Sequence, residues 1–332
     1  MDSVITMDYG SGGTKTSELI DSILVPAFSN PALNALGDGA VLPGGERLVF
    51  STDSFVVSPW KFPGGDIGKL AVCGTVNDVC MVGGEPKYLS LSLILEEGFA
   101  VENLRQIVSS AAETAARCGV QIVTGDTKVV ERGKGDQVYV NTSGIGVLRA
   151  SGLGREAVRP GDAVVVSGPV GCHGAAVMMA RGELPCEGEL LSDCMPLHAL
   201  SRALIEAGGL RIMRDPTRGG LATTLNEFVE GLPFTIEISE AAVPVTPGVR
   251  AACELLGLDP LYCACEGRIV AVIAPERAEA ALAALRALPG GEGAAQIGRV
   301  TEQRPGKVVL RTGLGGSRLL GKLAGGQLPR IC

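Results

Sequence analysis

The first half of the chain alternates between helical and strand-like hydrophobic patterns. Apolar residues recur at helical spacing in three segments, which predicts helices over 16–28, 67–82 and 101–118. Runs that alternate or are rich in β-branched residues predict strands over 47–57, 87–95, 120–130 and 137–148. Long alternating strands with helices on one face are typical of an α+β domain, so we expect this fold class.

A turn-rich stretch over 149–162 interrupts this pattern. It marks the predicted boundary between an N-terminal domain, 1–150, and a C-terminal domain, 160–311. In the second half, helices are predicted over 174–181, 197–207, 220–230, 248–256 and 276–288. Strands are predicted over 162–167, 234–238 and 269–274, and near Gln296 and Lys307. The second domain is therefore expected to be mixed α/β.

The last segment, 312–332, shows no further periodicity after Arg311. It contains a series of glycines and ends in Pro329-Arg330-Ile331-Cys332. This composition is typical of flexible segments, so a mobile tail is predicted. At about 3.3 Å per residue the extended tail spans at most about 70 Å, which would let Cys332 leave the body of the protein and return.

Composition and charge narrow the class of protein. Of 332 residues, 46% are hydrophobic and 20% charged, a balance that supports a buried core rather than disorder. The net charge is −7 and no basic stripe occurs, which disfavours a nucleic-acid partner. No signal peptide or membrane-spanning run is recognised, so a cytoplasmic location is expected. The ten cysteines lack zinc-site spacing and are expected to be mostly buried thiols.

Glycine is over-represented, with 47 residues in the chain, about twice the usual share of roughly 7%. One cluster, Gly10-Ser11-Gly12-Gly13-Thr14-Lys15-Thr16, resembles a phosphate loop because it opens a predicted helix whose free N–H groups could face an anion. It differs from a Walker A loop, which has glycine directly before the lysine. A flexible N-terminal turn is the alternative interpretation.

Aspartates beside glycine or other small residues lie at the ends of five predicted elements. They are Asp38, Asp53, Asp78, Asp126 and Asp215. Each alone could be a turn or helix-capping residue. Because Mg²⁺ prefers carboxylate oxygens together with phosphates, the five together favour a site for a nucleotide and its metal ion.

Four segments carry a resemblance to a known family. They are GKLAVCGTVND (68–78), GDTKVV (125–130), RDPTRGG (214–220) and the terminal PRIC. Over essentially its whole length the chain closely resembles the HypE family of hydrogenase maturation factors, which are carbamoyl dehydratases. This family lies within the aminoimidazole ribonucleotide synthetase (PurM-like) superfamily. The internal motifs fit the superfamily as a whole, and the terminal motif narrows the resemblance to HypE.

The resemblance implies a fold, a cofactor and partners. It implies a PurM-like two-domain architecture, and a homodimer in which N-terminal sheets with flanking helices pair into a β-barrel. ATP and Mg²⁺ would bind near that interface. It further implies that a carbamoyltransferase, HypF, carbamoylates Cys332, and that the carbamoyl group is dehydrated to a thiocyanate. The cyanide would then pass to iron on a HypC-HypD complex, to become a ligand of NiFe hydrogenase.

The resemblance also assigns roles to individual residues. Metal contacts are implied for Asp38, Asp78 and Asp215. Nucleotide contacts are implied for Gly12, Gly13, Asp53, Asn77, Gly125, Asp126 and Thr127. Roles in the reaction are implied for Cys332, Lys128 and Glu266. The chain departs from the family pattern at Tyr9, Cys172 and Cys265, and no role is transferred to these three.

The implied reaction has a chemical rationale of its own. Conversion of S–C(=O)–NH₂ to S–C≡N removes an oxygen, which is a poor leaving group from an amide-like carbon. Phosphorylation by ATP makes that oxygen part of a phosphate leaving group, while a base accepts the nitrogen protons. Lys128 would offset charge on the transferred phosphoryl group. Glu266 is the candidate base, with a solvated Glu266 paired to Arg268 as the alternative.

The leading hypothesis is therefore an ATP-dependent dehydratase that acts on its own carbamoylated Cys332. The sequence shows no strong local activation of this thiol, and an exposed terminal thiol without function is one alternative. Two alternative functions also stay open. One is a superfamily enzyme that acts on a free small molecule, and the other is a non-enzymatic thiol carrier in metal-centre assembly.

Overall fold

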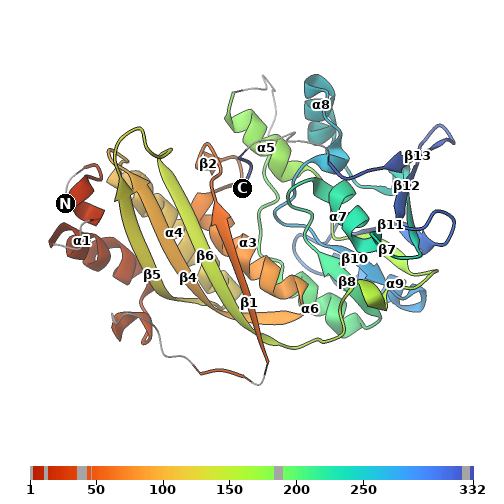
Figure 1. Cartoon of the computed structure of the whole chain (residues 1–332), viewed down its shortest axis with the longest axis horizontal. Helices are drawn as coiled ribbons and strands as arrows, with labels where there is room; N and C mark the ends of the chain where they lie inside the picture. Colours follow the sequence, from red (N-terminus) through yellow and green to blue (C-terminus); the bar gives the residue numbers. More distant parts are fainter. Residues whose placement is uncertain (1–2, 11–13, 36–42, 46, 183–189, 324–329) are drawn as a thin grey trace.

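The computed structural model describes residues 3–10, 14–35, 43–45, 47–182, 190–323 and 330–332. Two large sheets, each with its own helices, lie side by side, and the C-terminus lies between them (Figure 1). A small two-stranded sheet, β2 (Lys61–Phe62) and β3 (Gly65–Asp66), precedes α3. The chain passes between the sheets through 149–162, the segment where the sequence places the domain boundary. This architecture confirms the expected two-domain fold of mixed sheets and helices.

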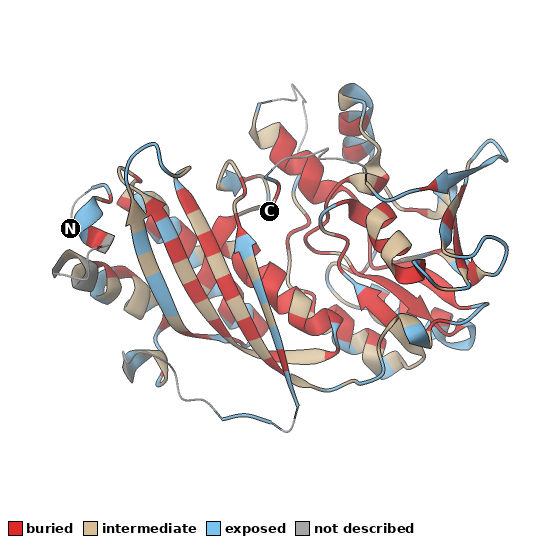
Figure 2. Ribbon diagram, viewed as in Figure 1, coloured by how far each residue is buried: buried red, intermediate tan, exposed pale blue. Residues whose placement is uncertain are grey.

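The N-terminal sheet has four strands in the order β1-β6-β4-β5. β4 (Gly84–Glu96) runs parallel to β5 (Gln121–Val130), while β6 (Val138–Leu148) is antiparallel to both β4 and β1 (Leu48–Phe55). Two helices, α3 (Ile67–Met81) and α4 (Val101–Cys118), lie behind the sheet in Figure 1. Burial alternates along β4 and β6, because one face of each strand packs toward these helices (Figure 2).

The face of this sheet away from α3 carries exposed apolar side chains. Phe50 is 67% exposed, Leu48 55% and Ile94 42%. The strand registers put Asp126 and Lys128 on the same face, because Asp126 pairs with Ser92 and Lys128 with Ile94. We call this surface the outer face.

The C-terminal sheet has seven strands in the order β13-β12-β9-β11-β7-β10-β8, and only β9 and β12 are parallel neighbours. The strands are β7 (Ala163–Val166), β8 (Leu210–Arg214), β9 (Thr235–Ser239), β10 (Val270–Ile273), β11 (Ala295–Thr301), β12 (Lys307–Arg311) and β13 (Ser317–Leu320). The helices are α5 (Cys172–Ala180), α6 (His198–Ala207), α7 (Gly220–Val229), α8 (Pro247–Leu256) and α9 (Ala278–Arg286).

Three local predictions need correction. The expected helix over 16–28 is divided into α1 (Thr14–Leu19), a π-helical turn (Ile20–Leu24) and α2 (Val25–Phe28). β8 was not predicted, because its short sequence LRIMR lacks a clear alternation. The expectation that regular structure ends at Arg311 is wrong, since β13 pairs with β12 and buries Leu320.

A single hydrophobic cluster joins the two domains. It contains residues of α3 and α4 together with Leu200 and Leu204 of α6, and α3 also contacts β8. Ile331, next to the C-terminus, belongs to the same cluster. Eight of the nine described cysteines are buried free thiols. Among the described residues, no helix has the length and apolarity needed to span a bilayer.

Candidate active site

Two of the predicted aspartates lie where β1 crosses α3. These two are Asp53 and Asp78. A further aspartate, Asp66, caps the start of α3 by accepting the N–H groups of Gly68 and Lys69 at 2.8 and 3.1 Å. Near the other end, Asp78 accepts a 2.8 Å hydrogen bond from the Ser51 hydroxyl. Asp53 shares the helix-facing side of β1 with Ser51, because side chains alternate along a strand.

Asp215 joins them from the C-terminal domain, directly after β8. Burial, reinforced by the negative charge of Asp78, raises the pKa of Asp215 to about 7. Burial also raises the pKa of Asp78, and the charge of Asp53 adds to that effect. The three carboxyl groups therefore lie close enough to repel one another, and a cation between them would relieve the repulsion.

The described part of the chain contains no group of three or more histidine, cysteine or acidic side chains arranged to hold a metal ion unaided. This fits Mg²⁺, which usually keeps several waters and takes one or two carboxylates plus substrate phosphates. Asp78 and Asp215 are suited to that task. Asp38, the third expected metal ligand, lies outside the described residues, as do Gly12 and Gly13.

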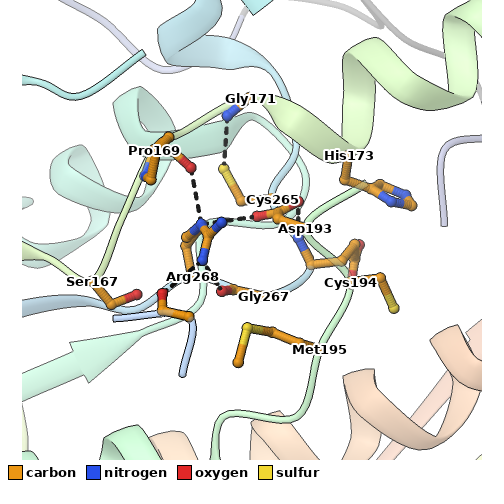
Figure 3. Close-up of polar contacts among 12 residues, drawn as sticks. Ser167, Pro169, Gly171, His173, Asp193, Cys194, Met195, Cys265, Gly267 and Arg268 are labelled. Atoms are coloured by element: carbon orange, nitrogen blue, oxygen red, sulfur yellow. Dashed lines mark hydrogen bonds and ion pairs between the residues drawn. The ribbon is translucent and has the colours of Figure 1, made fainter. Parts of the chain in front are cut away.

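Glu266 is buried near these aspartates, with 2% exposure. We call this region, where the two domains meet, the junction. Within the described part of the chain, the Oε1 atom of Glu266 has no hydrogen-bond partner. Burial, assisted by the nearby Cys194 and Asp215, raises the pKa of Glu266 well above its ordinary value. The alternative of a solvated Glu266 paired with Arg268 is wrong, because Arg268 Nε lies 3.5 Å from Asp193 Oδ2 instead (Figure 3).

Asp193 also fixes the backbone around Glu266. Its Oδ1 atom accepts the Glu266 N–H at 3.3 Å. A Cβ atom at Gly267 would lie 1.8 Å from the Asp193 carbonyl oxygen, so only glycine permits this approach. Asp193 was missed in the sequence because its partners are more than 70 residues away, a separation that no local pattern reveals.

Asn77 has a different environment from the implied nucleotide contact. Its side chain is completely buried and hydrogen-bonded to protein. The amide group donates to the carbonyls of Met195 and Glu266 at 3.2 and 3.4 Å, and its oxygen accepts the Leu197 N–H at 2.7 Å. In this arrangement Asn77 ties α3 to the segment that carries Glu266.

The C-terminal cysteine lies in this junction as well. Ile331 is 3% exposed, and the Val56 N–H donates to the main-chain oxygen of Cys332 at 3.1 Å. The pKa of the Cys332 thiol is raised to about 12, mainly by burial and also by the charge of Glu266, while Arg218 opposes the shift. The structure therefore brings Cys332 and Glu266 together. Arg218, a member of the RDPTRGG motif, was not predicted as a site residue.

Lys128 and Asp126 are not part of this junction in the single chain. They form a 2.7 Å ion pair on the outer face, with side-chain exposures of 62% and 57%. Asp126 of β5 pairs with Ser92 of β4, Ser92 pairs with Asn141 of β6, and Asn141 pairs with Ser54 of β1. Asp126 therefore lies three strand spacings from β1, about 14 Å at roughly 4.8 Å each. Their side chains point away from Glu266, on the opposite side of the sheet.

Two neighbours of these residues on β5 also lie outside the junction. Gly125 has a packing reason to be glycine, since a Cβ there would lie 2.3 Å from the Leu91 carbonyl oxygen. Thr127 lies on β5, an edge strand of the sheet, where it pairs with Leu93 of β4. No described contact in the single chain joins β5 to Cys332.

The three departures from the family pattern are all buried. Tyr9 lies beneath the Lys15 ammonium, 5.4 Å from its ring centre. Cys265 accepts the Gly171 N–H at 3.1 Å (Figure 3), and Cys172 is the first residue of α5. Burial raises the pKa values of both thiols, so the protonated form is favoured at each. Their thiols therefore serve as packing groups here.

Comparison with known proteins covers the whole chain. A family model described as "AIR synthase related protein, N-terminal domain" matches residues 36–148, and its C-terminal counterpart matches residues 159–311. The carbamoyl dehydratase HypE of Cupriavidus necator is 51% identical over 332 residues, which cover 99% of this chain and 95% of that protein.

Solved structures show the same relationship. A crystal structure of hydrogenase maturation protein HypE in complex with ATP aligns with a TM-score of 0.95 and 47% identity, covering 98% of this chain and 99% of that one. A HypE-HypF complex aligns with a TM-score of 0.80 and 44% identity, covering 92% and 99%. Identity of this level over the full length shows that the chain belongs to the HypE family of carbamoyl dehydratases, within the PurM-like superfamily.

Proposed function

We propose that this protein dehydrates the S-carbamoyl group on its own Cys332 to a thiocyanate, with consumption of ATP. The observation that carries the proposal is the position of the Cys332 thiol, whose pKa is raised by burial and then by the charge of Glu266. A terminal cysteine near a buried carboxyl group, whose Oε1 atom lacks a hydrogen-bond partner among the described residues, has the substrate and base of the proposed reaction close to each other.

The reaction divides into two balanced steps. First, the carbamoyl oxygen attacks the γ-phosphorus of ATP, ADP leaves, and one nitrogen proton is lost, which gives S–C(=NH)–O–phosphate. Second, the C–O bond breaks, phosphate leaves with its electron pair, and loss of the remaining nitrogen proton forms S–C≡N. Glu266 is suited to accept a proton, because its raised pKa makes its carboxylate a stronger base than an exposed glutamate.

ATP and Mg²⁺ are the proposed cofactors. A HypE solved in complex with ATP supports the nucleotide. The repulsion among Asp53, Asp78 and Asp215 supports a divalent cation, with Asp38 as a further proposed ligand and the Gly12-Gly13 loop as a phosphate contact. When bound, Mg²⁺ would supply charge neutralisation on the transferred phosphoryl group.

We further propose a homodimer formed through the outer face. Its exposed apolar residues, with Phe50 at 67%, are the surface that a second copy would bury. Because Lys128 and Asp126 point away from Glu266 in their own chain, we infer that they serve the site of the partner copy. Asp53, Asn77, Gly125 and Thr127 remain proposed nucleotide contacts, directly or through the backbone.

A mixing experiment tests the shared site. Lys128→Ala and Glu266→Gln should each be inactive alone as homodimers. After mixing and exchange, half of the dimers are mixed and each has one intact site, so about a quarter of the wild-type activity should return. Absence of any recovery despite verified exchange would show that Lys128 does not act across the interface.

The proposed partners follow the same chemistry. A HypF-type carbamoyltransferase would load Cys332, and the solved HypE-HypF complex supports that partner. An iron scaffold of the HypC-HypD type would accept the cyanide, and a cytoplasmic location is proposed for all of them.

Phosphate release distinguishes the proposed function from its two alternatives. Cys332→Ala should abolish phosphate release if the chain acts on its own cysteine, whereas an enzyme for free small molecules would retain it. A thiol carrier would release no phosphate, either as wild type or as Cys332→Ala.

A further inference from the structure

The tail docks mainly through its backbone. Residues 330–332 run alongside residues 56–58, which follow β1. The Val56 N–H donates to the Cys332 main-chain oxygen at 3.1 Å, and the Ser58 N–H donates to the Arg330 carbonyl at 3.4 Å. In return the Arg330 Nε–H donates to the Val56 carbonyl at 3.1 Å. These hydrogen bonds hold the tail against the segment that follows β1.

The conformation of Arg330 shows that the surroundings hold the tail in place. Its φ of 51° lies in the left-handed region, which is uncommon for residues other than glycine. Strained backbone of this kind persists where contacts over-determine it. The Arg330 guanidinium is paired with Asp136 and lies 5.9 Å from the Tyr139 ring centre, while Arg181 Nη2 donates to the Arg330 carbonyl at 2.7 Å.

One buried side chain contacts the residue directly before the cysteine. His173, in the first turn of α5, is completely buried, and its Nε2 atom lies 2.8 Å from the Ile331 carbonyl oxygen. Its ring also packs edge-to-face against Phe62, with ring centres 5.2 Å apart. The imidazole is therefore held on several sides.

The partners of His173 determine which nitrogen carries the proton. A carbonyl oxygen can only accept, so Nε2–H must be the donor to Ile331. Burial lowers the pKa of His173, which favours the neutral ring, and Nδ1 then accepts from the Ser192 hydroxyl at 2.8 Å. The Ser192 oxygen in turn accepts the Cys194 N–H at 3.0 Å. A chain of oriented hydrogen bonds thus runs from Cys194 to the tail.

We propose that His173 is a positioning residue for the reaction, which holds the tail inward through the Ile331 carbonyl so that the Cys332 sulfur lies beside Glu266. The inference rests on the proposed function for its catalytic consequence, but tail docking can be measured without it. Loss of the His173 donor should shift the tail outward. Loading of Cys332 by a carbamoyltransferase should then continue, while dehydration slows.

Alkylation of Cys332 by iodoacetamide measures docking directly, read as the mass of the C-terminal peptide over time. The docked thiol is half-buried and its pKa is raised to about 12, so it reacts slowly, whereas an undocked thiol reacts at an ordinary rate. Loss of one hydrogen bond should raise the undocked fraction and the alkylation rate about fivefold in His173→Leu.

Two variants separate positioning from general disruption. His173→Gln restores an N–H donor at the reach of Nε2 and should bring the alkylation rate back toward wild type. His198→Leu alters the other histidine of the chain, at the start of α6, and should leave the rate unchanged. Ser192→Ala serves if His173→Leu does not fold, and should accelerate alkylation in the same direction by removing the donor to Nδ1.

Several outcomes would overturn the inference. One is equal alkylation in wild type and a folded His173→Leu or Ser192→Ala protein. Another is faster alkylation with an unchanged rate of thiocyanate formation, which would show that docking by His173 does not position the sulfur. If wild-type protein forms no thiocyanate at all, the proposed function fails, while the alkylation rates still decide whether His173 holds the tail.

Discussion

Replacement of Asp215 by asparagine should separate catalysis from stability. The side chain is 7% exposed, and burial with the charge of Asp78 raises its pKa from 3.8 to about 7. In the metal-free protein near neutral pH, an ionised Asp215 therefore opposes folding. Asp215→Asn keeps the shape and removes the charge, so the variant should be inactive and yet more stable than wild type.

The size of the effect depends on pH in a defined direction. A carboxyl group whose pKa is higher in the folded protein binds its proton more tightly there, so stability is lost as pH rises from the unfolded toward the folded pKa. With values of 3.8 and about 7, the wild type loses ~2 kcal/mol by pH 5 and ~4 kcal/mol by pH 8 relative to Asp215→Asn.

The assay is urea unfolding of both proteins in EDTA at pH 5 and pH 8. The stability advantage of Asp215→Asn should grow by ~2–3 kcal/mol between the two. Asp162→Asn is the matched control, because Asp162 is also buried but accepts hydrogen bonds from the Arg159 N–H at 2.7 Å and Arg211 Nε at 3.3 Å. It should be destabilised at pH 8. An Asp215→Asn advantage that is absent, or that shrinks as pH rises, would refute the reasoning.

Two further predictions concern Gly267, which allows the close backbone approach of Asp193, and Glu266, the proposed base. Gly267→Ala should cost ~1–3 kcal/mol in urea unfolding and reduce dehydration, because its Cβ would lie 1.8 Å from the Asp193 carbonyl; full stability with full activity would contradict the close approach. Glu266→Gln should stop the reaction at the carbamoyl adduct on mass analysis of the tail, while phosphate release falls with it. Thiocyanate at the wild-type rate in that variant would exclude Glu266 as the base.

The sequence predicts the elements of this fold well where hydrophobic periodicity is sustained. The predicted helix over 101–118 matches α4, and the long strands β4, β5 and β6 lie within a few residues of their predicted ends. It fails at β8 and β13, which are short and lie at the two edges of the C-terminal sheet, where tertiary pairing rather than local pattern decides.

The candidate site is less predictable than the fold, because it is assembled from distant segments. Motifs identify Asp53, Asp78, Asp215 and Glu266, which the structure gathers at the domain junction. The face on which Lys128 lies follows from the strand register, and no motif reveals it. The roles of Asp193 and His173 depend on contacts 73 and 158 residues away in sequence. Such contacts appear only once the chain is folded.

The central claim is that the S-carbamoyl group on Cys332 is the substrate of the reaction. Its most direct test is the mass of the C-terminal peptide after incubation with carbamoyl phosphate, a HypF-type carbamoyltransferase and MgATP. The proposed phosphoryl-transfer route predicts a gain of about 43 Da on carbamoylation, followed by a loss of about 18 Da on dehydration. Neither change should occur in Cys332→Ala. A thiocyanate found on another cysteine, or an adduct on Cys332 that never loses water, would contradict the account.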